Sequence, residues 1–164
     1  MTMSKESFLS KYKTEIDRFI TSAFAEDLGD VDHTSRSCLS NDLTSKAQLL
    51  VKEPGVIAGV ELTEYIFKTK NNNFKFETKI NDGSAVNPGD IIFSVEGPQL
   101  ELLAIERLIL NCMQRMSGIA SLTKQTASLI KHTNCKLLDT RKTTPNFRYP
   151  EKWAVHIGGG ENHR

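Results

Sequence analysis

Apolar residues recur at helical spacing near the start of the chain, between residues 5 and 27. Positions three or four apart share one face of an amphipathic helix, and Gly29 supplies a stop signal after it. Shorter apolar or alternating runs then predict three strands, at residues 47–52, 74–78 and 91–96, and a helix at residues 61–68. This mixture of elements predicts an α+β module.

A longer apolar pattern at residues 100–116 predicts a helix packed on the sheet, and Ser117-Gly118 is expected to interrupt it. The elements expected beyond that point are a helix to residue 132, a buried strand at 136–139 and a helix around residue 153 that the glycines at 158–160 end. Helix, strand, loop and helix in succession are typical of an α/β unit. We therefore expect one domain at residues 1–116, including the long linking helix, and the first part of a second domain at residues 117–164.

Composition and charge narrow the class of protein. The chain has 164 residues, 38% hydrophobic residues and a formal net charge of +1, so no strong overall field points to nucleic acid or to a membrane surface. No apolar run approaches the roughly 18 residues of a membrane span, and the N-terminus lacks the apolar core of a signal peptide. Cys38, Cys112 and Cys135 have neither metal-ligand nor redox spacing. These features favour a cytoplasmic protein.

The charge is unevenly distributed along the chain. Residues 131–164 contain seven Lys or Arg and three Asp or Glu, a net +4, which leaves −3 for residues 1–130. Within this basic segment, Arg141 and Lys142 directly follow the expected strand at residues 136–139. Ligands of α/β folds bind beyond the carboxyl ends of strands, and Arg and Lys suit carboxylates and phosphates. The same charges are also compatible with a solvated loop.

Two further segments contain candidate binding residues. Residues 158–160 are three consecutive glycines, whose backbone can approach a ligand closely, although a plain flexible loop has the same composition. His163 and Arg164 follow them, and this pair can hold a carboxylate beside a ring. Arg107 lies on the long predicted helix, where an arginine is most often solvated or paired with an acid.

Three motifs together carry a resemblance to a known family. Asp-Thr-Arg-Lys-Thr-Thr-Pro at residues 139–145, Glu-Lys-Trp-Ala-Val at 151–155 and Gly-Gly-Gly-Glu-Asn-His-Arg at 158–164 closely resemble the signature of quinolinate phosphoribosyltransferases. Further similarities occur in order upstream, at residues 26–29, 54–59, 82–90, 97–98, 106–107 and 117–120. The resemblance spans nearly the whole chain and is more specific than any spacing argument.

The sequence departs from the family pattern at a few places. Asn146 stands where the family usually has glycine, Pro150 replaces an apolar residue, and Leu108 takes a position that is often Thr. The resemblance implies an N-terminal α+β sandwich followed by a C-terminal α/β barrel, and residues 117–164 match only the start of that barrel. The family's downstream lysine and two acidic residues have no counterpart in these 164 residues. The chain is therefore expected to be truncated, with the barrel incomplete, and inactive alone.

The resemblance also implies a reaction and roles for residues. Quinolinate and phosphoribosyl pyrophosphate would give nicotinate mononucleotide, pyrophosphate and CO2 in NAD biosynthesis, with Mg2+ accompanying the phosphoribosyl pyrophosphate. By the family pattern, Arg141, His163 and Arg164 hold the quinolinate carboxylates, and Thr140 adds a hydroxyl. Two residues are expected to be catalytic as well as substrate-binding, namely Lys142 at the phosphates and Arg107, donated across the interface of a homodimer or higher homo-oligomer. No metal ligand is expected among the residues present.

Alternatives remain at this point. A paralogue of the same fold associated with molybdenum transport has the same architecture, and a nicotinate-using phosphoribosyltransferase is related. From another class, the turn-rich segment 82–92 is similar to a biotinyl or lipoyl hairpin, but no Met-Lys-Met sequence occurs in the chain. A purely structural protein, in which Arg141 and Lys142 are incidental, is a further alternative.

Overall fold

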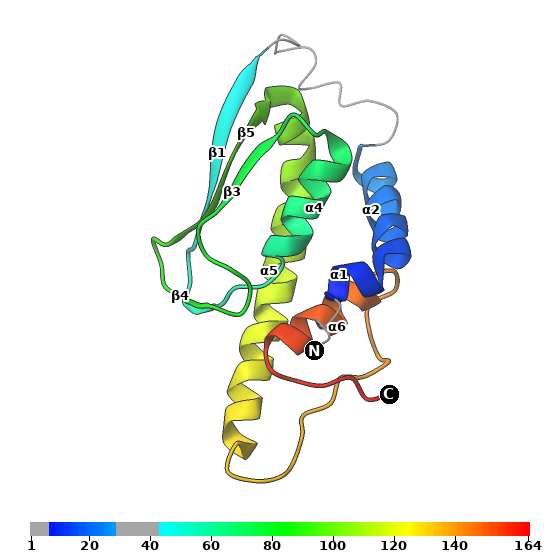
Figure 1. Ribbon diagram of the computed structural model, residues 1–164, viewed down its shortest axis with the longest axis vertical. Coiled ribbons are helices and arrows are strands. Elements are labelled where there is room, and N and C mark those ends of the chain that lie inside the picture. Colours follow the sequence, from blue (N-terminus) through cyan, green and yellow to red (C-terminus); the bar gives the residue numbers. More distant parts are fainter. Residues whose placement is uncertain (1–6, 29–42) are drawn as a thin grey trace, which may run out of the picture.

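The computed structural model describes residues 7–28 and 43–164 (Figure 1). Its helices are α1 (Phe8–Lys11), α2 (Lys13–Leu28), α4 (Val60–Lys70), α5 (Gln99–Ile130) and α6 (Arg148–Ile157). Its strands are β1 (Thr44–Leu50), β2 (Gly55–Val56), β3 (Lys75–Thr78), β4 (Ala85–Val86) and β5 (Ile91–Pro98). The strands and helices expected up to residue 96 are confirmed, apart from shifts at their ends and a break at Tyr12 that separates α1 from α2.

The main sheet is antiparallel, with the strand order β1-β5-β3, and β2 pairs with β4 in a second, two-stranded sheet. Val95 of the central strand lies between Ala47 and Phe76 on its neighbours. Phe76 in turn contacts Phe93 and Phe67, with ring centroids 4.6 and 5.7 Å apart. These aromatic contacts attach α4 to the inner face of the sheet.

Helices α4 and α5 cover one face of the main sheet, and α2 lies on the far side of them (Figure 1). The N-terminal helices also contact α6 through stacked or tilted rings. Phe8 lies 5.3 Å from Trp153, and Tyr12 lies 5.0 Å from Tyr149. Because buried Trp153 belongs to the same hydrophobic cluster as the sheet residues, the C-terminal segment is packed onto the N-terminal one.

The expected interruption at Ser117-Gly118 is wrong, because α5 is a continuous helix of 32 residues. Serine disrupts helices when its hydroxyl bonds to nearby backbone. Here the Ser117 hydroxyl instead accepts a hydrogen bond from the Ala58 N–H at 3.0 Å and donates to the Ala58 carbonyl at 3.2 Å. Gly118 is exposed, so it weakens the helix only through backbone entropy. Contacts with the segment around β2 hold the helix through this point.

Replacing Gly118 by alanine is expected to stabilise the protein. A Cβ atom there would meet nothing within 4 Å, so the helical preference of alanine acts alone and raises the unfolding free energy by about 0.5–1 kcal/mol. Urea unfolding measures the change. Gly158→Ala is the matched control, because its Cβ would lie 2.6 Å from the Ala120 carbonyl oxygen and should destabilise the protein. A less stable Gly118→Ala variant would contradict the prediction.

The prediction of a buried strand at residues 136–139 is also wrong, because this segment is not buried. Leu138 forms a single parallel bridge with Glu161, and its side chain is 52% exposed. Burial of a parallel strand requires neighbours on both sides and helices on both faces. Among the described residues only one neighbour is present, at Glu161. The helix expected around residue 153 is confirmed as α6, and it ends at Gly158.

The turn-rich segment that is similar to a carrier hairpin has a structural role in this fold. The Asp82 carboxylate accepts hydrogen bonds from the Val60 and Glu61 N–H groups at 2.9 and 3.0 Å. It thereby caps the start of α4, whose N-cap residue Gly59 has no side chain to do so and adopts a φ of 100°.

Membrane-spanning helices are not found among residues 7–28 and 43–164, because no helix there combines the necessary length and hydrophobicity.

Candidate functional site

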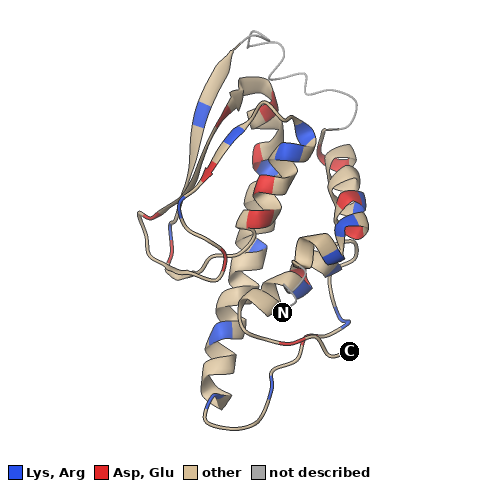
Figure 2. Cartoon of the chain, in the orientation of Figure 1, with Lys and Arg blue, Asp and Glu red and all other residues tan. Residues whose placement is uncertain are grey.

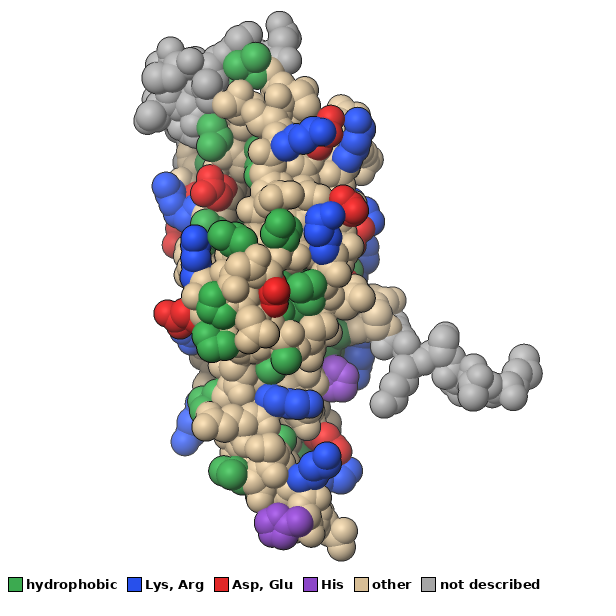
Figure 3. Space-filling view, turned by 90° about the vertical axis from the view of Figure 1, so that its left-hand side faces the viewer, with side chains coloured by type: hydrophobic (Ala, Val, Ile, Leu, Met, Phe, Trp, Pro, Cys, Tyr) green, Lys and Arg blue, Asp and Glu red, His purple; other side chains and the backbone are tan. Residues whose placement is uncertain are grey.

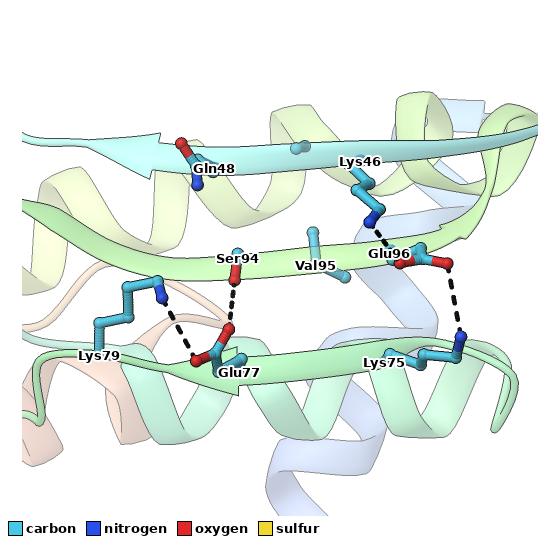
Figure 4. A pocket seen from close by; sticks show the side chains of 9 residues that line it. Lys46, Gln48, Lys75, Glu77, Lys79, Ser94, Val95 and Glu96 are labelled. Carbon is cyan, nitrogen blue, oxygen red and sulfur yellow. Dashed lines mark hydrogen bonds and ion pairs between the residues drawn. The ribbon is translucent and has the colours of Figure 1, made fainter.

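The hollow on the open face of the main sheet is not near the candidate residues. It has a volume of about 730 Å³ and lies over β1, β5 and β3 (Figure 4). Figure 3 views the molecule from the left-hand side of Figure 1, where basic side chains are scattered rather than gathered in one patch. The charges of the hollow compensate one another: Glu96 lies between Lys46 and Lys75, and Glu77 contacts Lys79 and the Ser94 hydroxyl. Figure 2 shows that this sheet carries both basic and acidic positions. The face resembles an ordinary solvated sheet surface and supplies no cluster for substrate chemistry.

The parallel bridge between Leu138 and Glu161 brings the two C-terminal motifs together. The Asp139 N–H donates to the Glu161 carbonyl, and the Glu161 N–H donates to the Leu137 carbonyl, each at 2.9 Å. Two short parallel segments therefore end side by side. Residues 139–142 and 162–164 leave the same edge, where α/β folds bind ligands.

Asp139 is the centre of this edge. Its Oδ1 lies 2.5 Å from His163 Nδ1 and accepts the His163 backbone N–H at 3.1 Å, and its Oδ2 lies 2.6 Å from Lys152 Nζ. Because the carboxylate is an acceptor only, Nδ1 of His163 carries the proton in this contact. Nε2 is then the atom that His163 offers to a ligand. Lys152 Nζ lies 3.3 Å from Nδ1 but donates to the Asp139 carboxylate, because a protonated Nδ1 cannot accept from it.

The Asp139 carboxylate stays ionised although it is almost completely buried. Its side chain is only 4% exposed, and that of Lys152 is 12% exposed. Burial by itself raises the pKa of Asp139, but hydrogen bonds from Lys152 and His163 outweigh it, and the pKa is lowered overall. The carboxylate is therefore charged at neutral pH and orients both Lys152 and His163.

The remaining candidates lie around this centre with their side chains toward solvent. Arg141, Lys142 and Arg164 are exposed, and within residues 7–28 and 43–164 their side chains form no hydrogen bond or ion pair. The Thr140 hydroxyl accepts the Lys142 N–H at 3.1 Å and so shapes the turn that presents the cations. An anionic ligand at this edge would find Arg141, Lys142 and Arg164 available.

Arg107 does not join this group within the described chain. It lies near the start of α5, where its guanidinium contacts Asp27 of α2 at 2.5 Å. Both residues line a second hollow of about 520 Å³ between α2, α5 and residues 144–147. Arg107 is 71% exposed, so it points outward from the chain that carries it.

A second buried carboxylate fixes the loop that follows Lys142. Glu151 Oε1 accepts hydrogen bonds from Arg115 Nε and Nη2 at 2.9 and 2.7 Å, and also from the Thr144 hydroxyl at 2.8 Å. Its Oε2 accepts the Thr144 N–H at 3.1 Å. Burial alone raises the pKa of Glu151, but the Arg115 and Thr144 hydrogen bonds lower it overall. The carboxylate stays charged and ties the loop to two helices.

Backbone conformation explains the departures from the family pattern. Asn146 has a φ of 62°, the left-handed region in which glycine is strain-free and asparagine is the best-tolerated alternative. Pro150 lies in the first turn of α6, where a backbone N–H has no partner within the helix. Both replacements preserve the local geometry.

Two of the glycines at residues 158–160 lie against other parts of the protein, whereas a Cβ atom at Gly159 would meet nothing within 4 Å. A Cβ at Gly158 would lie 2.6 Å from Thr123 Cβ, and one at Gly160 would lie 2.5 Å from a methyl group of Val155. Gly159 has a φ of 92°. The three glycines thus let the chain turn against α5 and return to Glu161, which places His163 beside Asp139.

Three residues of this region were not recognised as functional from the sequence: Lys152, Glu151 and Arg115. Lys152 and Glu151 lie in the motif at residues 151–155, where an acidic and a basic residue at the start of a helix look like ordinary solvated positions. No local signal marks Arg115, whose partner is 36 residues away.

The carboxylates that the structure describes here do not fit a magnesium site. Asp139 is held by Lys152 and His163, Glu151 by Arg115, and Glu161 by Lys136 at 2.8 Å. In the described part of the chain, no group of three or more His, Cys, Asp or Glu residues is arranged to hold a metal ion. A metal ion bound here would need ligands from its substrate or from other residues.

Two family models match the chain from residue 32 onward. The one described as "Quinolinate phosphoribosyl transferase, N-terminal domain" matches residues 32–117, and "Quinolinate phosphoribosyl transferase, C-terminal domain" matches residues 119–164. Quinolinate phosphoribosyltransferase (decarboxylating) 1b of Nicotiana tabacum is 45% identical over 87% of this chain and 40% of its own length. The probable nicotinate-nucleotide pyrophosphorylase (carboxylating) of Bacillus subtilis is 35% identical over 92% of this chain and 52% of its own.

Solved structures agree with these matches. NadC from Streptococcus pyogenes superimposes with a TM-score of 0.85 and 35% identity, over 92% of this chain and 55% of that one. Human nicotinic acid phosphoribosyltransferase, at 12% identity and a TM-score of 0.52, shares the fold alone. The chain spans about 40–52% of the length of these two curated relatives.

Proposed function

The chain belongs to the quinolinate phosphoribosyltransferase family, and on that premise we propose that it supplies part of the site that converts quinolinate to nicotinate mononucleotide. Its fold is the N-terminal α+β domain of that family followed by the beginning of the α/β barrel. The proposed activity is that of a protein in which these 164 residues are combined with the remainder of the barrel.

One observation carries the proposal: Arg141, His163 and Arg164 leave the same edge of paired parallel segments, around the charged Asp139. Quinolinate is a pyridine with two adjacent carboxylates, which need several fixed cations. Arginine provides a fork of donors for a carboxylate, and His163 offers Nε2. Thr140 lies in the same turn and adds a hydroxyl.

The proposed reaction has two steps. The pyridine nitrogen forms a bond to the ribose carbon of phosphoribosyl pyrophosphate as the bond from that carbon to pyrophosphate breaks. The alkylated ring then accepts the electron pair of the carbon–carboxylate bond, CO2 leaves, and a proton takes its place. We assign Lys142 to the phosphates, because it is exposed beside the proposed quinolinate cations and its point charge offsets the leaving group's charge. Any Mg2+ would accompany the phosphoribosyl pyrophosphate, since Asp139, Glu151 and Glu161 are already paired with basic side chains.

Arg107 is proposed to act in the site of a neighbouring subunit of a homodimer or larger homo-oligomer. It projects from α5 beside Asp27 and is not brought to Asp139 within its own chain. An exposed arginine that reaches a neighbouring site would complete the cation set there.

A cytoplasmic location is part of the proposal. It rests on the two cysteines of the described residues, Cys112 and Cys135, which form no disulfide bond. Some relatives are described otherwise, as mitochondrial in Nicotiana tabacum and chloroplastic in Arabidopsis thaliana.

Quinolinate is expected to bind more tightly than nicotinate. A chimera joining residues 1–164 to the remaining barrel of the Bacillus subtilis relative provides a complete site. The second carboxylate adds at least one charge-assisted contact of about 1.5–3 kcal/mol, so the affinities should differ by roughly 10- to 100-fold. Calorimetric titration with both acids measures the ratio.

Arg164→Met should reduce this preference, whereas Lys131→Met, an exposed cation at the end of α5, should not. Equal affinity of the chimera for the two acids would overturn the proposed substrate.

A further inference from the structure

Arg115 lies on the face of α5 that carries Arg107. The two residues are eight positions apart, about 12 Å along a helix, and both line the hollow between α2, α5 and residues 144–147. The Arg115 guanidinium makes two hydrogen bonds to Glu151 Oε1 and a third, at 2.7 Å, to the Thr144 hydroxyl. Helix α5 is therefore hydrogen-bonded directly to the loop that follows Lys142.

We propose that Arg115 is a positioning residue that, through Glu151 and Thr144, holds the loop bearing Arg141 and Lys142 in its binding geometry. This inference rests on the proposed function, because it assigns that loop to substrate. Arg141 and Lys142 have no side-chain partner in the described residues to hold them, so the order of their loop depends on its anchors.

The hydrogen bonds of Thr144 make it a strong anchor. Its hydroxyl and its N–H both contact Glu151, whose side chain is 10% exposed, and its carbonyl accepts the Phe147 N–H at 3.1 Å. A further hydrogen bond spans Lys142, from the Thr143 N–H to the Arg141 carbonyl at 2.9 Å. Removing Arg115 leaves the Glu151 carboxylate buried without its cation, which loosens its hold on Thr144.

The arrangement also has a geometric consequence. Because α5 is continuous, Arg107 and Arg115 belong to one rigid helix. A shift of α5 when Arg107 engages a neighbouring subunit would be transmitted through Arg115 to Thr144. Helix α5 thus links Arg107, which is proposed to act in the neighbouring subunit, with the loop that carries Arg141 and Lys142 in its own chain.

The first test measures order in the 164-residue chain, without any substrate. Arg115→Met is expected to raise the hydrogen exchange rate of the Thr144 amide at least about tenfold, because its acceptor Glu151 loses its anchor. Arg115→Lys, which retains the charge but not the fork, should fall between. Exchange in β5 should not change in either variant. Lys124→Met, an exposed cation on the same helix, is the matched control.

The second test uses the chimera. Arg115→Met should lower kcat/KM for quinolinate roughly 10- to 100-fold, Arg115→Lys should restore part of it, and Lys124→Met should have no effect. Thr144→Val should give a similar loss, and the double variant should lose less than the product of the two, because both changes break one network. A merely structural role for Arg115 would give multiplicative losses.

Different results would contradict the positioning role of Arg115 and the proposed function. Unchanged Thr144 exchange in Arg115→Met, or fully multiplicative losses in the double variant, would overturn the positioning role. A folded wild-type chimera without turnover of quinolinate would instead refute the proposed function, while the exchange data would still decide whether Arg115 anchors the loop.

Discussion

Mixing two inactive chimeras is expected to restore about a quarter of the wild-type activity if each site is built from two subunits. The variants are Arg107→Met and Arg141→Met, each of which should lose roughly 100-fold or more in kcat/KM when assayed alone. Random exchange gives half the dimers as heterodimers, and each of those has one site with both arginines intact. Activity measured against mixing ratio tests the expectation.

The structure gives the physical reason for this design. Arg107 contacts Asp27 and is 71% exposed, whereas Arg141 lies beyond the paired segments at Leu138 and Glu161. Nothing in the described chain brings the two arginines together. Mixing Arg141→Met with Arg164→Met is the control, because each subunit's own site then lacks one arginine, so no dimer has an intact site. Absence of recovery for the first pair, with subunit exchange demonstrated by mass spectrometry, would rule out a shared site.

Asp139→Asn is expected to be the most disruptive isosteric substitution in the site. It leaves Lys152, only 12% exposed, without its counter-ion, and removing one partner of a buried pair typically costs about 3–5 kcal/mol. Asparagine can also turn its amide toward His163 Nδ1, which would reverse the direction of that hydrogen bond. The chimera should therefore lose both stability and quinolinate affinity. Urea unfolding and calorimetric titration measure the two losses separately.

The pH dependence of stability tests the same contact. Because the pKa of Asp139 is lowered in the folded chain, its stabilising contribution is present above the unfolded pKa of about 3.9 and is lost as the pH falls through the lower folded value. Glu151, whose pKa is also lowered, has the same sign. Wild-type stability should thus decline in acid, and part of that decline should be missing from Asp139→Asn.

Glu53→Gln provides the control, because Glu53 is exposed and has no hydrogen bond or ion pair among the residues described. Its acid profile should match that of the wild type. An Asp139→Asn profile identical to the wild-type profile would show that Asp139 is not the charged centre of this edge.

The sequence by itself determined the elements whose residues carry their own signal. The period-two alternation at residues 74–78 became β3, and the helical spacing at residues 61–68 became α4. The family could also be identified from the sequence. In motifs such as residues 139–145, charged residues occur in a specific order that the formation of a helix or strand does not require. The roles of Arg107, Lys142 and the other site residues remain predictions from that resemblance.

Only the tertiary structure decided how distant segments act on one another. Ser117 looked like a helix breaker, yet its hydroxyl bonds to Ala58, 59 residues away, and α5 continues. No prediction from the sequence involved Arg115, Glu151 or Lys152 individually, and only the fold places them against Thr144 and Asp139. A local sequence pattern shows which face of a helix or strand is apolar. A buried ion pair depends instead on where the helix or loop that carries the second residue packs, and the fold as a whole determines that position.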